Sequence, residues 1–82
     1  MKPTIGRIVH FYDESLAGKP YKGDIRLNGS DKGPYPAMVI QTFNGDYVNL
    51  LVHAWGGDWR EGSIAERVDD KQVRYWVWPP RE

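Results

Sequence analysis

Four tryptophans are the residues of this sequence whose types and spacing best suggest a binding chemistry. Trp76 and Trp78 are two residues apart, so both indoles point to one face if this segment is a strand. Such a pair can stack a base or hold a cation, or it can close one end of a barrel. Trp55 and Trp59 flank a glycine-rich stretch beside Arg60. Aromatic residues in such loops often contact ligands or partner chains, whereas the alternative is a loop folded back over a thin core.

Three polar residues interrupt otherwise apolar runs. Arg7 can pair with an internal acid or fork onto a phosphate, and Asn49 can read a base edge or satisfy a loop carbonyl. His10 and His53 are the only histidines; with nearby aspartates they could bind a metal or do acid–base work, but their spacing matches no metal-ligand motif. A structural hydrogen bond is the alternative role for His10. The candidate ligand-binding set is therefore Arg7, His10, Asn49, Trp55, Trp59, Arg60, Trp76 and Trp78.

No arrangement of residues in the sequence indicates catalysis. Ser15, Ser30 and Ser63 lie in no nucleophile-elbow context, and no glycine loop of the P-loop type is present. The paired carboxylates Asp69 and Asp70 are better explained as turn residues. The absence of cysteine excludes disulfides, thiolate zinc sites and a cysteine nucleophile. We expect a non-enzymatic protein with no catalytic residues, no metal and no cofactor.

The charge balance restricts the possible partners. Eleven basic and eleven acidic residues cancel, whereas proteins that track along duplex DNA usually carry a basic excess. The neutral net charge does not exclude a small anionic ligand held by one or two arginines. We expect no signal peptide, because the first residues contain no apolar segment, and no run reaches membrane-spanning length. Cysteine-free composition suits a reducing compartment, so we expect a cytoplasmic protein that does not engage membranes.

The elements that must position these residues are short strands. Six prolines and nine glycines interrupt β-rich runs along residues 1–82, which favours one all-β domain. We expect a first strand at Thr4 to Tyr12, and a hairpin of Tyr35 to Phe43 and Asp46 to Ala54. Asn44-Gly45 between them predicts a type I′ turn. Alternation in the second strand of this hairpin predicts a core formed by Val48, Leu50, Val52 and Ala54.

The remaining segments complete a small all-β domain. Asp13 to Pro34 is polar and rich in glycine, which predicts a long loop, with a short ribbon around Tyr21 to Leu27. Trp55 to Gly62 is expected to be a turn-rich loop, Ser63 to Val68 a short fourth strand, and Val73 to Trp78 the last strand. The pattern predicts a single all-β barrel or sandwich of about five strands, with the long polar loop between strands 1 and 2.

Four segments carry a resemblance to a known family. The chain opens with residues 2–10 (KPTIGRIVH), continues with 36–40 (PAMVI) and 48–52 (VNLLV), and closes with 76–80 (WVWPP). This pattern resembles a widespread family of short, mostly uncharacterised proteins of tailed phages and prophages, and it implies an SH3-like small barrel. The chain departs from the pattern at Phe11, where many members have tyrosine, and its loop at residues 55–59 is individual.

These features lead to three functional hypotheses. The first is a phage-encoded, non-enzymatic protein in the host cytoplasm that sequesters a nucleotide-derived immune signal. By analogy with other small phage proteins, it would be a homo-oligomer with the ligand at subunit interfaces. The alternative is a protein–protein interaction or virion accessory module, in which exposed aromatic residues meet a partner. The third is a single-stranded nucleic-acid binder, against which the neutral charge weighs.

Overall fold

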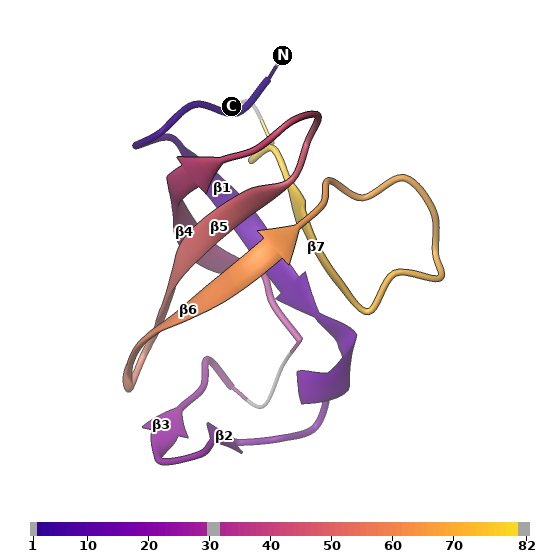
Figure 1. The fold of residues 1–82 in the computed structure, drawn as a ribbon. Coiled ribbons are helices and arrows are strands. Elements are labelled where there is room, and N and C mark those ends of the chain that lie inside the picture. The colour runs from indigo at the N-terminus through magenta and orange to yellow at the C-terminus, as the bar shows by residue number, and fades with distance from the viewer. Residues whose placement is uncertain (1, 30–31, 81–82) are drawn as a thin grey trace.

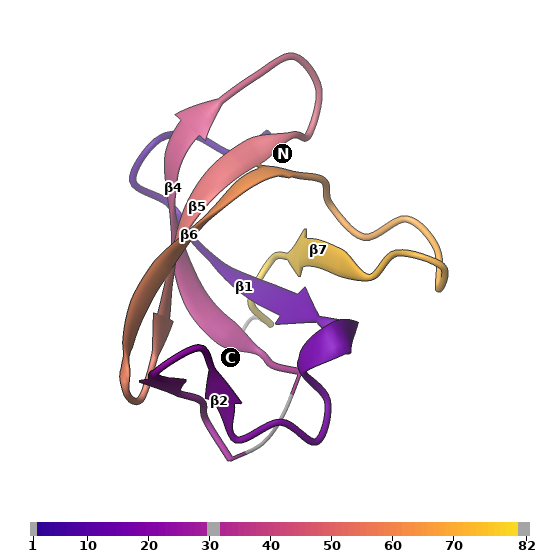
Figure 2. The same ribbon diagram turned by 60° about the horizontal axis from the view of Figure 1, so that its bottom comes forward.

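Two antiparallel sheets make up the fold of the computed structural model, which describes residues 2–29 and 32–80. The larger sheet curls into a half-barrel with the strand order β6-β5-β4-β1-β7 (Figures 1 and 2). In that order its strands are Gly57–Ile64, Val48–Ala54, Tyr35–Thr42, Ile8–Asp13 and Arg74–Val77. This architecture confirms the predicted all-β fold and is compatible with a small SH3-like barrel.

The long segment between β1 and β4 contains the remaining elements. A 3-10 turn, η1 (Glu14–Leu16), follows β1, and β2 (Tyr21–Lys22) pairs with β3 (Ile25–Arg26) as a small separate hairpin. This hairpin is the short ribbon predicted within the polar loop. No helix in the described parts of the chain is long and apolar enough to cross a membrane.

The core lies on the concave face of the curled sheet. Because side chains alternate along a strand, each central strand sends every second residue inward. Leu16 and Leu27 from the long β1–β4 connection add to this core. The fully buried apolar side chains of the sheet are Val9, Phe11, Tyr35, Ala37, Val39, Val48, Leu50, Val52 and Trp76. The predicted core residues of β5 are thus confirmed, with Ala54 partly buried against the cluster.

The segment after β6 helps to close the half-barrel. It returns alongside β7 in parallel, with an isolated bridge between Glu66 and Trp76. The Trp76 amide donates to the Ala65 carbonyl at 3.1 Å, and the Arg67 amide donates to the Trp76 carbonyl at 3.0 Å. The second edge of β7 is therefore covered by the same chain, which limits exposure of unpaired backbone groups.

Two predictions for the C-terminal half, one of a loop and one of a strand, were wrong. Residues 57–64 form β6, although 55–62 were expected to be a loop and 63–68 a strand. Only Trp55 and Gly56 form the turn between β5 and β6. The buried carboxylate of Glu61 occupies an inward position that apolar alternation would assign to a hydrophobic residue, so the pattern concealed the strand.

Two local details also differ from expectation. The first strand begins at Ile8 because Gly6 has a φ of 92° and the Arg7 amide closes a turn onto Thr4 at 3.1 Å. The hairpin at Asn44-Gly45 is confirmed, but its turn is not type I′. Only Gly45 has a positive φ (77°) there, and the loop closes through the Phe43 amide.

Candidate functional site

The C-terminal tryptophan pair closes one part of the barrel. Trp76 is fully buried, and its indole Nε1 donates to the Asp46 carbonyl at 2.9 Å. Trp78 packs edge-on against Trp76, with 5.2 Å between ring centroids and an interplanar angle of 88°. The guanidinium of Arg7 lies 5.3 Å from the Trp78 ring centroid, which is a cation–π arrangement. The structure therefore brings three predicted residues together as a layered cover of the core.

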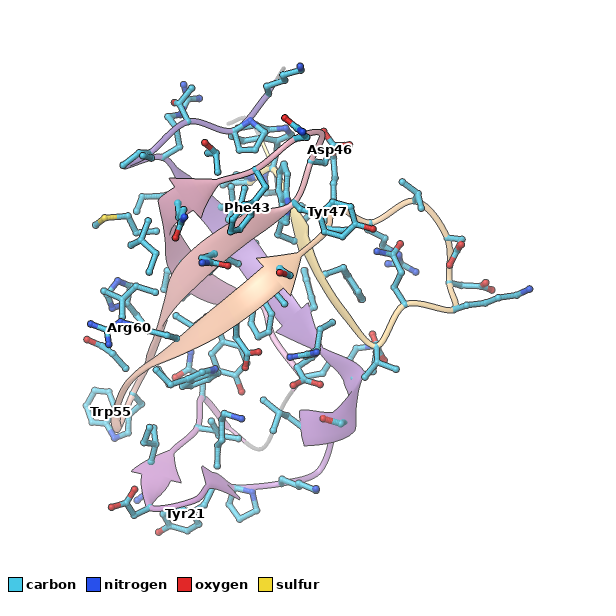
Figure 3. All side chains as sticks on the ribbon, in the orientation of Figure 1. Tyr21, Phe43, Asp46, Tyr47, Trp55 and Arg60 are labelled. Carbon is cyan, nitrogen blue, oxygen red and sulfur yellow. The ribbon has the colours of Figure 1, made fainter. Side chains whose placement is uncertain are left out.

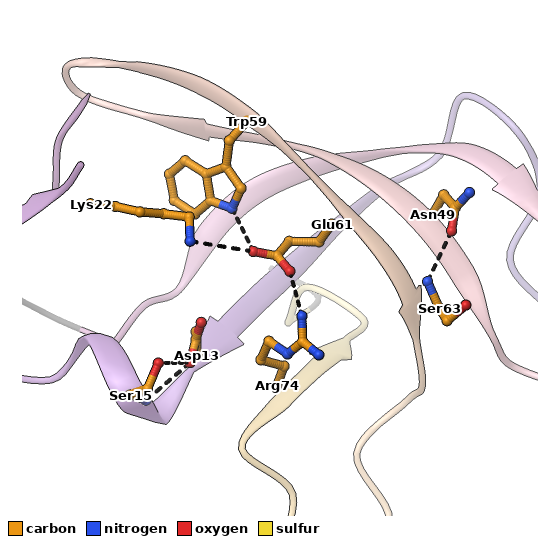
Figure 4. Close-up of polar contacts among 8 residues, drawn as sticks. All are labelled: Asp13, Ser15, Lys22, Asn49, Trp59, Glu61, Ser63 and Arg74. Carbon is orange, nitrogen blue, oxygen red and sulfur yellow. Dashed lines mark hydrogen bonds and ion pairs between the residues drawn. The ribbon is translucent and has the colours of Figure 1, made fainter. Parts of the chain in front are cut away.

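Trp59 belongs to a buried polar cluster rather than to a loop. Its Nε1 donates to Glu61 Oε2 at 2.8 Å, and its ring packs edge-on against Tyr35 at 5.6 Å. Glu61 is only 7% exposed. Arg74 donates to its Oε1 at 2.8 Å, and Lys22 Nζ lies 3.9 Å from its Oε2 (Figure 4). The Lys22 ammonium also lies 5.5 Å from the Trp59 ring. This carboxylate thus ties β2, β6 and β7 together.

Asn49 joins three strands through both ends of its amide. Its Oδ1 accepts from the Ser63 backbone N–H at 2.9 Å (Figure 4). Its Nδ2 donates to Gln41 Oε1 at 3.2 Å. The register of β4 against β5 shifts just before Gln41, and that of β5 against β6 shifts at Asn49. Asn49 therefore holds two neighbouring strand irregularities in place, through a backbone N–H rather than a loop carbonyl.

His10 lies half-buried on the outer face of the sheet. In the strand register it is opposite Pro36 on one side and Val77 on the other. Within residues 2–29 and 32–80, no three histidine, aspartate or glutamate side chains gather into a group that could hold a metal ion. His10 is thus separated by the sheet from the buried indole of Trp76, which points to the opposite face.

Trp55 lies at a turn that is packed directly on the small hairpin. Its amide donates to Asn28 Oδ1 at 2.6 Å, and the Gly56 amide donates to the Arg26 carbonyl at 2.8 Å. The indole itself is 80% exposed, and Tyr21, directly opposite Arg26 in the β2–β3 register, is 52% exposed. We call Tyr21, Arg26 and Trp55 the tip surface; its two aromatic residues lie at the same end of the molecule in Figure 3.

Arg60 lies on β6, beyond the tip surface. It is exposed and pairs in register with Leu51, so it projects from the outer face of the sheet, opposite to the inward Trp59. The eight predicted site residues therefore fall into separate places, with only Arg7, Trp76 and Trp78 in one cluster.

A depression that the sequence did not indicate lies at the other end of the sheet. It has a volume of about 630 Å³, is shallow and open, and is lined by Thr42, Phe43, Asn44, Tyr47 and Ser63. Phe43 and Tyr47 are 45% and 53% exposed. They lie near Asp46, far from Trp55 and Tyr21 in Figure 3. The available signal was the pair of aromatic residues that flank the Asn-Gly turn.

One further polar group connects η1 to β7. Glu14 accepts a hydrogen bond from the Tyr75 hydroxyl at 2.8 Å and one from Lys32 Nζ at 3.2 Å, and these bonds lower the pKa of its carboxyl. Burial and the same bond to Glu14 raise the pKa of Tyr75. Tyr75 also stacks on Tyr12, with 5.3 Å between the ring centroids. These contacts stabilise the fold and are not part of either exposed surface.

Comparison with known proteins adds no family or function to this geometry. No family model matches the chain, and no curated protein and no solved structure matches it either. The two exposed surfaces are therefore the features from which a function has to be argued.

Proposed function

We propose that this chain is a non-enzymatic binding module that attaches to a protein partner through the tip surface. The observation that carries the proposal is Trp55, whose indole is 80% exposed although its turn is fixed by Asn28 and Arg26. Tryptophan, tyrosine and arginine are the residues most often found at energetic centres of protein interfaces. The tip surface contains one of each.

The free energy available from burying the exposed Trp55 ring favours a binding role for the tip surface. Burying a large aromatic side chain removes about 150–250 Å² from water, which at about 25 cal/mol per Å² corresponds to about 4–6 kcal/mol before the costs of association. Because the turn is already held by two hydrogen bonds, little backbone ordering has to accompany binding. A partner with an apolar pocket for the indole is therefore the chemistry that fits.

The proposal also includes an origin in a phage or prophage. The opening segment at residues 2–10 and the closing segment at residues 76–80 support an origin in a tailed phage or prophage. In that setting the partner is a virion protein or a protein of the host cytoplasm, and the module is an accessory protein. Duplex DNA is a poor candidate because the net charge is zero.

One observation favours the nucleotide-sequestering alternative. Arg7 lies over the partly buried ring of Trp78, and an arginine beside an aromatic ring can bind a phosphate while the ring stacks a base. That hypothesis requires a homo-oligomer that completes the site at a subunit interface. Calorimetry with cyclic nucleotides and ADP-ribose derivatives tests it, and Arg7→Ala should abolish any heat that is observed. Fluorescence polarisation with short oligonucleotides at low salt tests the single-stranded nucleic-acid alternative.

The protein-binding proposal is tested with Trp55→Ala and a matched control. Val68 is also an exposed apolar residue (79%) but lies outside the tip, so Val68→Ala removes exposed apolar surface elsewhere. Partners captured from infected cells are quantified by mass spectrometry for the three proteins, and the selected partner is purified and titrated. We expect Trp55→Ala to lose at least about 2 kcal/mol, or about 30-fold in affinity.

One result would refute the proposal: Trp55→Ala, like Val68→Ala, binds the purified partner with the affinity of the parent chain, so that the contact lies elsewhere. Sedimentation over a range of concentrations shows whether the chain forms a closed symmetric dimer, in which the partner is a second copy of this chain.

A further inference from the structure

We infer that the depression between the β4–β5 turn and the end of β6 is a binding site for an uncharged saccharide. Its lining combines two exposed aromatic rings, Phe43 and Tyr47, with the hydroxyls of Thr42 and Ser63 and the amide of Asn44. This surface lies at the opposite end of the molecule from Trp55 (Figure 3), so the inference does not depend on the proposed function.

The backbone around the depression is built by two strand irregularities. The register shifts on both sides of β5 bring Ser63 of β6 next to the β4–β5 turn, and Asn49 fixes the Ser63 amide at 2.9 Å. Bulges of this kind are common next to functional sites, where they redirect a side chain. Here they place a hydroxyl beside the aromatic pair.

Ser63 adopts a strained conformation at this position. Its φ is 56°, and it is the single non-glycine residue with a positive φ in the described parts of the chain. For a residue with a Cβ this left-handed conformation is unfavourable, so glycine would be the expected occupant of a purely structural position. Strain of this kind tends to occur at ligand sites. A ligand bound in the depression would give the hydroxyl of Ser63 a role at a position where the backbone favours glycine.

The turn that carries the aromatic pair is held from below. The Phe43 amide donates to the Tyr47 carbonyl at 3.1 Å, and the buried indole of Trp76 donates to the Asp46 carbonyl at 2.9 Å. The two rings are thus presented by a loop attached to the core. The Trp76 indole N–H also becomes a spectroscopic reporter of events in this loop.

The chemistry of the lining selects the ligand class. The lining contains no lysine, arginine or histidine, and Asp46 lies in the same turn, so a phosphate or carboxylate would meet no counter-charge. An apolar ligand would need burial that a shallow, open depression cannot provide. A pyranose ring fits, since its C–H face stacks on an aromatic ring while its hydroxyls bond to amide and hydroxyl side chains and to water.

Nuclear magnetic resonance titration of the full chain tests this inference. The probes are cellotriose, maltotriose and triacetylchitotriose, with adenosine monophosphate as a charged comparison. We expect one of the sugars to shift the backbone amides of residues 42–47 and 63, the Asn44 side-chain amide and the Trp76 indole N–H. The Trp55 indole should stay unchanged, because it lies at the other end of the molecule.

Matched variants locate the site. Tyr47 and Tyr21 are almost equally exposed, at 53% and 52%, so Tyr47→Ala should weaken sugar binding at least tenfold while Tyr21→Ala leaves it unchanged. Ser63→Gly should raise the melting temperature, because glycine accepts a φ of 56°, and weaken binding at the same time.

Three outcomes would overturn the inference. One is the absence of shifts with all three sugars at tens of millimolar. Another is equal loss of binding in Tyr47→Ala and Tyr21→Ala. The third is stronger shifts of the same resonances by adenosine monophosphate, which would assign the depression to a nucleotide. Trp55→Ala should leave sugar binding intact, so failure here and failure of the protein-binding proposal are distinguishable.

Discussion

Gly56→Ala is the substitution that most directly tests how the tip surface is held. A Cβ at this position would come 2.7 Å from Arg26 Cβ and 2.8 Å from Arg26 Cα, and it would meet the Arg26 backbone nitrogen even more closely. Backbone atoms of β3 cannot yield as a flexible side chain would. Forcing an extra methyl group into such a contact costs about 1–3 kcal/mol. Separation of the two hairpins would also lose the Gly56–Arg26 hydrogen bond, worth about 0.5–1.5 kcal/mol.

The matched control is Gly62→Ala, within β6, the strand that follows this turn. A Cβ at Gly62 would have an ordinary contact of 3.5 Å with Asn49 Oδ1, and neither glycine has a positive φ. Both changes restrict the unfolded chain equally, by about 0.4–1 kcal/mol, so the control should be neutral or slightly stabilising. The difference between the two variants therefore isolates the steric effect at Arg26.

Thermal unfolding and amide hydrogen exchange measure the effect. For a domain of this size 1 kcal/mol corresponds to roughly 4–8 °C in Tm, so Gly56→Ala should melt clearly below Gly62→Ala. The amides of Trp55 and Gly56 should exchange faster in the first variant, because their acceptors belong to the displaced segment. Equal melting temperatures for the two variants, with unchanged exchange at Trp55, would refute the close packing of the two hairpins.

Four other predictions concern stability. Glu61→Gln should lower the free energy of unfolding by about 1.5–3 kcal/mol, measured by urea titration, with the lower value favoured because Arg74 is half-exposed. Hydrogen bonding lowers the pKa of Glu14 from 4.5, so the contribution of its carboxylate to folding stability is present above pH 4.5 and disappears as the pH falls through the folded pKa. Tyr75→Phe removes one of these hydrogen bonds, so it should shift this acid transition to higher pH in thermal melts. The pKa of Tyr75 is raised above 10.0, so its contribution is present below pH 10 and is lost as the pH rises through the folded pKa. Asn49→Ala should cost about 1–3 kcal/mol in urea titration, because a backbone N–H loses its acceptor.

The parts of the fold that alternation controls could be predicted from sequence. Residues 48, 50 and 52 form an apolar row of period two, and the structure buries all three. The Asn-Gly pair marked the hairpin correctly, although the turn type was wrong because the loop closes between Phe43 and Tyr47. Local chemistry therefore indicated where the chain reverses but not how many residues the reversal uses.

The parts that depend on distant partners could not be predicted. Glu61 is buried beside Arg74 and Lys22, which approach it from other elements, and no residue near Glu61 in the sequence indicates these partners. The same distance conceals the role of Asn49, which depends on the backbone of β6. The depression beside Phe43 likewise needs two register shifts that no pattern in a single strand records.

The buried Glu61 cluster provides the physical link between the fold and the exposed tip. Lys22 belongs to β2, so its approach to Glu61 and its position over Trp59 fix the small hairpin to the barrel at one point. The bond between Gly56 and Arg26 fixes it at a second point. A two-stranded hairpin this short is not stable alone, and two attachments give it a defined orientation. Trp55 is therefore held by a segment that the core itself keeps in place, which is the arrangement expected of an anchor residue in a binding surface.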